Sequence, residues 1–176
     1  YFEGARQFED SGEHVAYNRC GSCGFLFTPV MHQWSVDDYK NRVYNGDYIK
    51  TDPPFDYERP ARNAQMLNSL FGDHLKTFSM LDYGGGRGTL VDILKENNLA
   101  RKAWSYDPFY GDALPGTLKT YDLLTSFEVV EHVPDQHDLF SKMLSLVDNS
   151  GIALFSTLLQ PDDIDDIRLD WWYACP

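Results

Sequence analysis

A glycine-rich segment carries the strongest chemical signal in this 176-residue sequence: residues 81–88 read Leu-Asp-Tyr-Gly-Gly-Gly-Arg-Gly. Glycines at 84, 86 and 88 allow the backbone to turn sharply and to approach a ligand closely. A dinucleotide fingerprint, GxGxxG, would need its last glycine at position 89, where the sequence has Thr89. Asp82 precedes the first glycine by two residues and would repel a pyrophosphate. The spacing therefore favours a ligand with an ammonium group.

Two carboxylates and an imidazole form a second candidate constellation. Glu128, Glu131 and His132 directly follow an apolar run. Their ExxEH spacing suits acid–base chemistry or the binding of a divalent metal ion. Because a histidine titrates near neutral pH, His132 is a candidate general base, with Glu131 as its partner. The pattern leaves three interpretations open: a metal site, a catalytic pair near a substrate, and a structural role.

A CxxC turn near the N-terminus is the third candidate. Cys20 and Cys23 can occupy two corners of a tetrahedral zinc site, which needs four ligands. His14 and His32 are candidates for the others, whereas Cys175 is distant in the sequence. Two free thiols are the alternative. A redox role is disfavoured because no thioredoxin-like strand and helix surround the motif.

The composition excludes several classes of protein. With 27 acidic and 15 basic residues, the net charge of −12 argues against a general electrostatic grip on nucleic acid or on an anionic membrane. Apolar runs are too short for a membrane-spanning helix, and 15% aromatic residues argue against disorder. Three cysteines are too few for a disulfide framework, so we predict a cytoplasmic protein. Both ends look abrupt, and we expect a fragment or part of a longer chain.

The elements that must position these residues alternate along the chain. Hydrophobic patterns predict strands at 78–83, 103–107, 122–127 and 151–157, and helices at 57–75, 89–98 and 134–147. Strands that alternate with helices imply an α/β fold with a parallel-rich sheet and helices on both faces. The acidic tail after residue 158 is predicted to be a loop.

The N-terminal part is predicted to be a small cysteine-containing cap. Short strands at 15–19 and 25–27 flank the CxxC turn. Ser35 can cap a helix over 36–43, and residues 52–54, Asp-Pro-Pro, read as a breaker and linker. We therefore expect a cap and linker over 1–54 and a second domain over 55–176, which we expect to be incomplete at its C-terminus.

Together these motifs resemble the Rossmann-like S-adenosylmethionine-dependent methyltransferases. The glycine segment corresponds to the family's first motif, Asp107 to the acid that ends its second strand, and residues 121–133 to its fourth-strand segment. The resemblance covers about residues 76–160. It implies methyl transfer from S-adenosylmethionine to a small molecule, which we expect to be a nucleotide sugar or to resemble a secondary metabolite. The acidic composition predicts no nucleic-acid partner, and the oligomeric state stays open.

The resemblance also implies a cofactor-binding set drawn from the glycine turn and the strand ends: Asp82, Gly84, Gly85, Gly86, Gly88, Asp107, Pro108, Phe109, Ser126 and Phe127. In the family pattern Asp82 lies near the methionine ammonium, and Asp107 accepts hydrogen bonds from both ribose hydroxyls. The glycines lie under the methionine and ribose parts. The two residues after Asp107 pack against adenine, and the last two of strand 122–127 line the sulfonium side.

The order of segments is similar to methyltransferases that carry an N-terminal zinc ribbon and an aromatic-rich stretch before the catalytic domain. These include C-methyltransferases that act on nucleotide-linked deoxysugars. The similarity implies structural zinc at Cys20 and Cys23 with an incomplete ligand set. Six aromatic residues are candidates for a lid over cofactor and substrate, and ordinary core or interface packing is the alternative. They are Tyr39, Tyr44, Tyr48, Trp171, Trp172 and Tyr173.

Two departures from the family pattern keep other functions open. Only 13 residues separate Asp107 from Tyr121, where the family fits a helix and a strand, and Asp112 is the candidate reader of the adenine amine. The ExxEH segment resembles metal-binding methyltransferases that act on small RNAs or in the ubiquinone pathway. A metal-assisted O-methyltransferase that uses Glu128/Glu131/His132 is therefore one alternative. A non-catalytic cofactor-binding or interaction module is the other.

Overall fold

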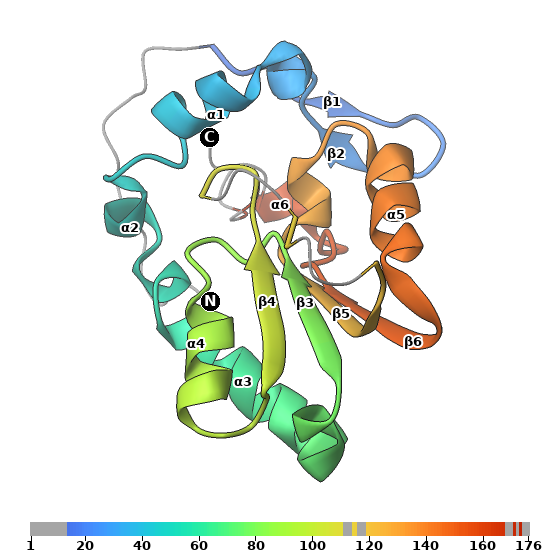
Figure 1. Ribbon diagram of the computed structural model, residues 1–176. Helices are drawn as coiled ribbons and strands as arrows, with labels where there is room; N and C mark the ends of the chain where they lie inside the picture. Colours follow the sequence, from blue (N-terminus) through green and yellow to red (C-terminus); the bar gives the residue numbers. More distant parts are fainter. Residues whose placement is uncertain (1–13, 111–113, 116–118, 168–170, 172, 174–176) are drawn as a thin grey trace. The chain divides into compact units, whose positions relative to one another are not determined.

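The computed structural model describes residues 14–110, 114–115, 119–167, 171 and 173 (Figure 1). The chain forms two compact units. One spans residues 34–158, and the other combines the N-terminal stretch up to residue 33 with the stretch from residue 159 onward. The units thus divide at 33/34 and 158/159, while the predicted domain division at 54/55 stays a prediction.

A four-stranded parallel sheet forms the centre of the 34–158 unit (Figure 1). Its strands are β3 (Ser79–Tyr83), β4 (Lys102–Tyr106), β5 (Tyr121–Phe127) and β6 (Val147–Ser156). They lie in the order β4-β3-β5-β6. This arrangement confirms the predicted α/β fold, because the chain crosses between parallel neighbours through intervening segments.

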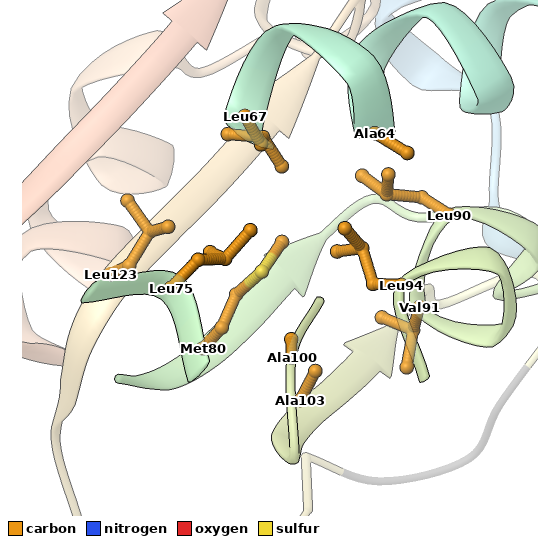
Figure 2. Packing of buried hydrophobic residues seen from close by; sticks show 10 residues of the cluster. All are labelled: Ala64, Leu67, Leu75, Met80, Leu90, Val91, Leu94, Ala100, Ala103 and Leu123. Carbon is orange, nitrogen blue, oxygen red and sulfur yellow. The ribbon is translucent and has the colours of Figure 1, made fainter. Parts of the chain in front are cut away.

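Helices cover both faces of this sheet. They are α3 (Glu58–Phe71), η3 (Gly72–Lys76), α4 (Thr89–Glu96) and α5 (Gln136–Ser145). Successive strand residues point to opposite faces, so Met80 packs into a core with α3 and α4, whereas Leu81 packs into a second core with α5. Figure 2 shows the first core: Ala64, Leu67, Leu75, Met80, Leu90, Val91, Leu94, Ala100, Ala103 and Leu123.

The segment before α3 contains short helices. They are α1 (Val36–Arg42), α2 (Tyr48–Thr51) and the 3₁₀ turn η2 (Pro53–Phe55). Ser35 caps α1 as predicted: its hydroxyl accepts the Asp38 N–H at 3.1 Å, and the Asp38 carboxylate accepts the Ser35 N–H at 2.8 Å. The predicted breaker at 52–54 separates α2 from α3 but is no open linker. Asp52 is 1% exposed and accepts a 2.6 Å hydrogen bond from Arg59.

The other unit is built on the CxxC hairpin. Strands β1 (Asn18–Arg19) and β2 (Leu26–Phe27) pair antiparallel, within the predicted stretches but shorter than them. The tail is not only a loop, because Ile164–Ile167 forms the short helix α6. The Gln160 side chain accepts the Leu26 N–H at 2.6 Å and donates to the Gly24 carbonyl at 3.1 Å. The tail thereby supplies hydrogen bonds that complete the hairpin. A 3₁₀ turn, η1, covers Val30–Gln33.

The short crossover predicted between residues 107 and 121 is present. Its described residues, 107–110, 114–115 and 119–120, form no helix or strand. No helix among the described residues is long and apolar enough to cross a membrane.

Candidate functional site

The glycine turn lies at the carboxyl end of β3, between its neighbours β4 and β5 (Figure 1). Ligand sites of open α/β sheets form at this edge. Gly84, Gly86 and Gly88 have φ angles of 77°, 55° and 84°, which L side chains rarely adopt. The Gly84 N–H donates to the Tyr106 carbonyl at 2.7 Å, so the turn is fixed to the end of β4. These φ angles confirm that the turn needs glycine at the three alternate positions.

The turn is also closely packed. A Cβ at Gly85 would overlap Ser105 Oγ and Asp82 Oδ2, and a Cβ at Gly86 would lie 2.9 Å from the Phe55 ring. Side chains at either position would displace the turn or its supports. The backbone of the turn therefore lies so close to these side chains that only glycine fits without displacement.

Three polar residues form a row across the sheet under this turn. Asp82 pairs in register with Ser105 of β4 and with Thr125 of β5. The Thr125 hydroxyl donates to Asp82 Oδ1 at 2.7 Å. Ser105 Oγ is buried and has no hydrogen-bond partner among the described residues. Burial, together with the charge of Asp107, raises the pKa of Asp82 to about 7, although the Thr125 hydrogen bond lowers it.

Asp107 follows β4 and holds the turn from the side. Its Oδ2 accepts the Gly86 N–H at 3.0 Å, and its Oδ1 accepts the Phe109 N–H at 2.8 Å. Burial raises the pKa of this carboxyl, and the backbone hydrogen bonds oppose that shift. A carboxylate oxygen can accept more than one hydrogen bond, so Asp107 retains capacity for ligand hydroxyls.

The residues after Asp107 differ in their surroundings. Pro108 is exposed. The Phe109 ring stacks on Tyr44, with centroids 4.7 Å apart and planes at 22°, and contacts Tyr39 at 5.9 Å. Asp112 lies outside the described residues. Of these residues, Phe109 is therefore the one that belongs to an aromatic surface beside the turn.

The two residues at the end of β5 are also separated. Ser126 is fully buried and lies two residues after Leu124, hence on the face of the sheet that α5 covers. Asp82 lies on the opposite face, with Met80. Phe127 packs against the core of that opposite face. The geometry therefore does not bring Ser126 to the face that carries Asp82.

The ExxEH segment directly follows β5 and includes the short 3₁₀ turn η4 (Val130–His132). Glu128 has a φ of 57°, unusual for a residue with a side chain. Its Oε1 accepts the Ser156 hydroxyl hydrogen at 2.8 Å. His132 Nε2 lies 3.8 Å from Glu131 Oε1, so the predicted pair is adjacent. Burial lowers the pKa of His132, while the charges of Glu131 and Glu128 oppose that shift, and 44% of the imidazole is accessible. The lowered pKa favours the neutral form of the His132 imidazole.

The CxxC turn lies in the loop that joins β1 to β2. The Cys20 sulfur accepts backbone hydrogen bonds from Cys23 and Ser22, which lower the pKa of Cys20. Across the described part of the chain, no three His, Cys, Asp or Glu side chains are grouped so that they could hold a metal ion. Cys175 and Trp172 lie outside the described residues.

Two members of the polar row, Ser105 and Thr125, escaped the sequence reasoning. Ser105 lies in β4 two residues before Asp107, and Thr125 lies in β5 one residue before Ser126. The available signal is a polar residue near the carboxyl end of three successive strands that share one sheet edge. Reading that signal requires the strand register, which places both residues beside Asp82.

The fold and this turn define a class of protein. A family model described as a methyltransferase domain matches residues 55–176. The match covers more than half of the chain, and the protein belongs to this methyltransferase family. No curated protein and no solved structure gives a significant match.

Proposed function

We propose that this protein transfers a methyl group from S-adenosylmethionine to a small-molecule acceptor. The observation that carries the proposal is the link between the glycine turn and Asp107. The Gly86 N–H donates to Asp107, whose remaining acceptor capacity suits a ribose diol. The buried Asp82 carboxylate beneath the turn suits an ammonium group.

The donor set fits this cofactor. A Cβ at Gly84 would lie 2.5 Å from the Val129 side chain, and a Cβ at Gly85 would overlap Ser105 and Asp82. The turn therefore keeps this shape only with glycine. When bound, S-adenosylmethionine supplies an electrophilic methyl group. The chain's own contribution is then to orient the reactants and to accept a proton where the acceptor must lose one. His132, with Glu131 beside it, is the proposed base.

The finer assignments are proposals that rest on the sequence resemblance. The acceptor class is a nucleotide sugar or a molecule that resembles a secondary metabolite. Zinc at Cys20 and Cys23 is proposed only as a structural ion, with ligands from outside the described residues, and the cytoplasmic location rests on cysteine usage. The metal-assisted alternative is distinguished by an activity assay with added Mg²⁺ and with a chelator: a response to either would support it.

Calorimetric titration with S-adenosylmethionine and S-adenosylhomocysteine tests the proposal. We expect binding in the micromolar range, where cofactor and substrate constants of enzymes commonly lie. Asp107→Ala should abolish binding, whereas Asp92→Ala, an exposed change on α4, should leave it intact. Circular dichroism checks that each variant is folded. Failure of the folded wild-type chain to bind either ligand would overturn the proposal.

A further inference from the structure

Glu128 adopts a left-handed backbone conformation at the point where the chain leaves β5. Its φ is 57°, and among the described residues that carry a side chain only Asn98, just after α4, shares a positive φ. This conformation is disfavoured about 10-fold for an L residue with a Cβ. It persists only where the surrounding contacts hold it, and such residues are concentrated at functional sites. The contacts of Glu128 therefore indicate what its conformation is for.

Two hydrogen bonds hold Glu128 to Ser156, the last residue of β6. The Glu128 N–H donates to the Ser156 carbonyl at 3.0 Å, and Glu128 Oε1 accepts the Ser156 hydroxyl hydrogen at 2.8 Å. Ser156 is also the register partner of Phe127, so the backbone bond extends the β5–β6 pairing by one residue. The backbone and the side chain of Glu128 are thus fixed by the same residue.

The residue that follows Glu128 contacts the glycine turn. A Cβ at Gly84 would lie 2.5 Å from one methyl group of Val129 and 3.0 Å from the other, so Val129 packs directly on Gly84. The Val129 carbonyl accepts the His132 N–H at 3.0 Å, and this bond closes the η4 turn. Because β5 lies between β3 and β6 (Figure 1), the end of β6 is joined through Glu128 and Val129 to the turn that ends β3.

We propose that Glu128 is a positioning residue of the methyltransferase site, an inference that rests on the proposed function. Its left-handed conformation, held by Ser156, places Val129 against Gly84 and starts the turn that carries Glu131 and His132. An ordinary φ at this position would send the following segment in another direction. The role of Glu128 therefore depends on an acceptor oxygen for Ser156 and on a positive φ, and not on its negative charge.

Three substitutions of Glu128 separate these requirements. Glu128→Gln keeps the acceptor oxygen without the charge, Glu128→Gly adopts a positive φ without steric cost, and Glu128→Ala loses the acceptor and keeps the strain. Calorimetric titration with S-adenosylmethionine and S-adenosylhomocysteine should give affinities within about 2-fold of the wild type for the Gln and Gly variants. The Ala variant should bind about 3- to 10-fold more weakly, because the conformation is disfavoured by about that factor.

Ser156→Ala tests the other side of the same contact. It removes only the hydroxyl that donates to Glu128 Oε1, and it should weaken binding about as much as Glu128→Ala. Adding Glu128→Gly to this variant should restore binding, since glycine needs no support for a positive φ. Asn98 supplies the matched control, because its φ is 54° and it follows α4 at the end away from the glycine turn. Asn98→Ala and Asn98→Gly should differ in stability and not in cofactor affinity.

Amide resonances of the chain without ligand provide a readout that is independent of the cofactor. The N–H resonance of Gly84 reports the packing of Val129, and that of His132 reports the hydrogen bond of η4. Both should shift in Glu128→Ala and stay near their wild-type positions in the Gln and Gly variants. A role in stability alone would lower the midpoint of thermal unfolding in Glu128→Ala and leave the affinity and these resonances unchanged.

The outcomes separate this inference from the function on which it rests. Equal losses of affinity in Glu128→Gly and Glu128→Ala would show that the backbone conformation is not the cause, and a similar loss in Glu128→Gln would show that the charge is required. Either result overturns the inference while the proposed function stands. If Glu128→Ala does not fold, Ser156→Ala takes its place in the comparison. Absence of binding by the folded wild-type chain would overturn the proposed function, and the Gly84 and His132 resonances would still decide whether Glu128 sets the local geometry.

Discussion

The Thr125 hydroxyl donates a 2.7 Å hydrogen bond to Asp82 Oδ1, and both side chains are buried at the edge of the sheet that carries the glycine turn. Burial raises the pKa of Asp82 to about 7, with a further contribution from the charge of Asp107. A carboxylate that is half-protonated near neutral pH is an unusual support for a cationic ligand. It has consequences for binding and for stability.

Cofactor affinity should fall as the pH is lowered through 7. An ammonium group favours the ionised form of Asp82, so protonation of this carboxyl competes with binding. A group with a pKa of about 7 gives a dissociation constant that rises about tenfold between pH 8 and pH 6. Calorimetric titration across this range measures the effect. Asp82→Asn should bind more weakly and with a much flatter pH profile, and an unchanged slope in this variant would assign the dependence to another group.

Stability should change with pH in the same window. The folded pKa of Asp82 lies above the value of about 3.9 for an unfolded chain, so between about pH 4 and 7 the folded state holds the extra proton. The free energy of unfolding should therefore decrease as the pH rises through this window, by up to about 1.4 kcal/mol per pH unit from this group. Urea unfolding of Asp82→Asn should lack that contribution. Asp92→Asn, on the exposed side of α4, should unfold with the same pH dependence as the wild type.

Gly85→Ala should damage both the fold and the site. The added Cβ would overlap Ser105 Oγ and Asp82 Oδ2, whose residues lie side by side on two adjacent strands. Overpacking of this kind costs about 1–3 kcal/mol. Urea unfolding measures the loss, and calorimetry should show that binding disappears. Gly46→Ala is the matched control, because a Cβ at Gly46 meets nothing within 4 Å. Equal stabilities of the two variants would contradict the packing argument.

Local patterns in the sequence were enough to predict most of the 34–158 unit. The glycine spacing, the apolar runs and the helix cap at Ser35 depend on near neighbours, and each strand and long helix was placed within a few residues. One error of four residues is at β6, which begins at Val147 and not at residue 151. Its first residue pairs with Tyr121 across a register shift, a long-range contact that no local pattern contains.

The features that escaped prediction depend on residues distant in the sequence. The polar row needs the register that aligns Ser105 and Thr125 with Asp82. The Gln160 side chain bonds to Gly24, 136 residues away, and so the tail read as a loop belongs to the hairpin unit. Single side chains at such distances carry no periodic signal. The candidate site was predictable where one motif supplied it, as at the turn, and not where the fold assembled it.

The Asp52–Arg59 ion pair is another contact that local sequence patterns do not reveal. Asp52 stands in an Asp-Pro-Pro stretch that reads as a linker, yet its side chain is 2% exposed and that of Arg59 24% exposed. Removal of one member of a buried pair leaves the other charge uncompensated, at a cost of about 3–5 kcal/mol. Asp52→Ala should lower the free energy of unfolding by about this amount in urea denaturation.

Asp47→Ala is the appropriate comparison, because Asp47 pairs with Lys50 at 2.5 Å while both side chains are about three-quarters exposed. Such a surface pair contributes about 0–1 kcal/mol. The double variant Asp52→Leu/Arg59→Met should recover much of the stability lost by Asp52→Ala, since it removes both charges together. Similar small losses for Asp52→Ala and Asp47→Ala would mean that residues 52–54 behave as a linker after all. The large difference expected instead would show that the ion pair anchors this stretch to α3, where Asp52 also accepts a 3.4 Å hydrogen bond from the Tyr48 hydroxyl.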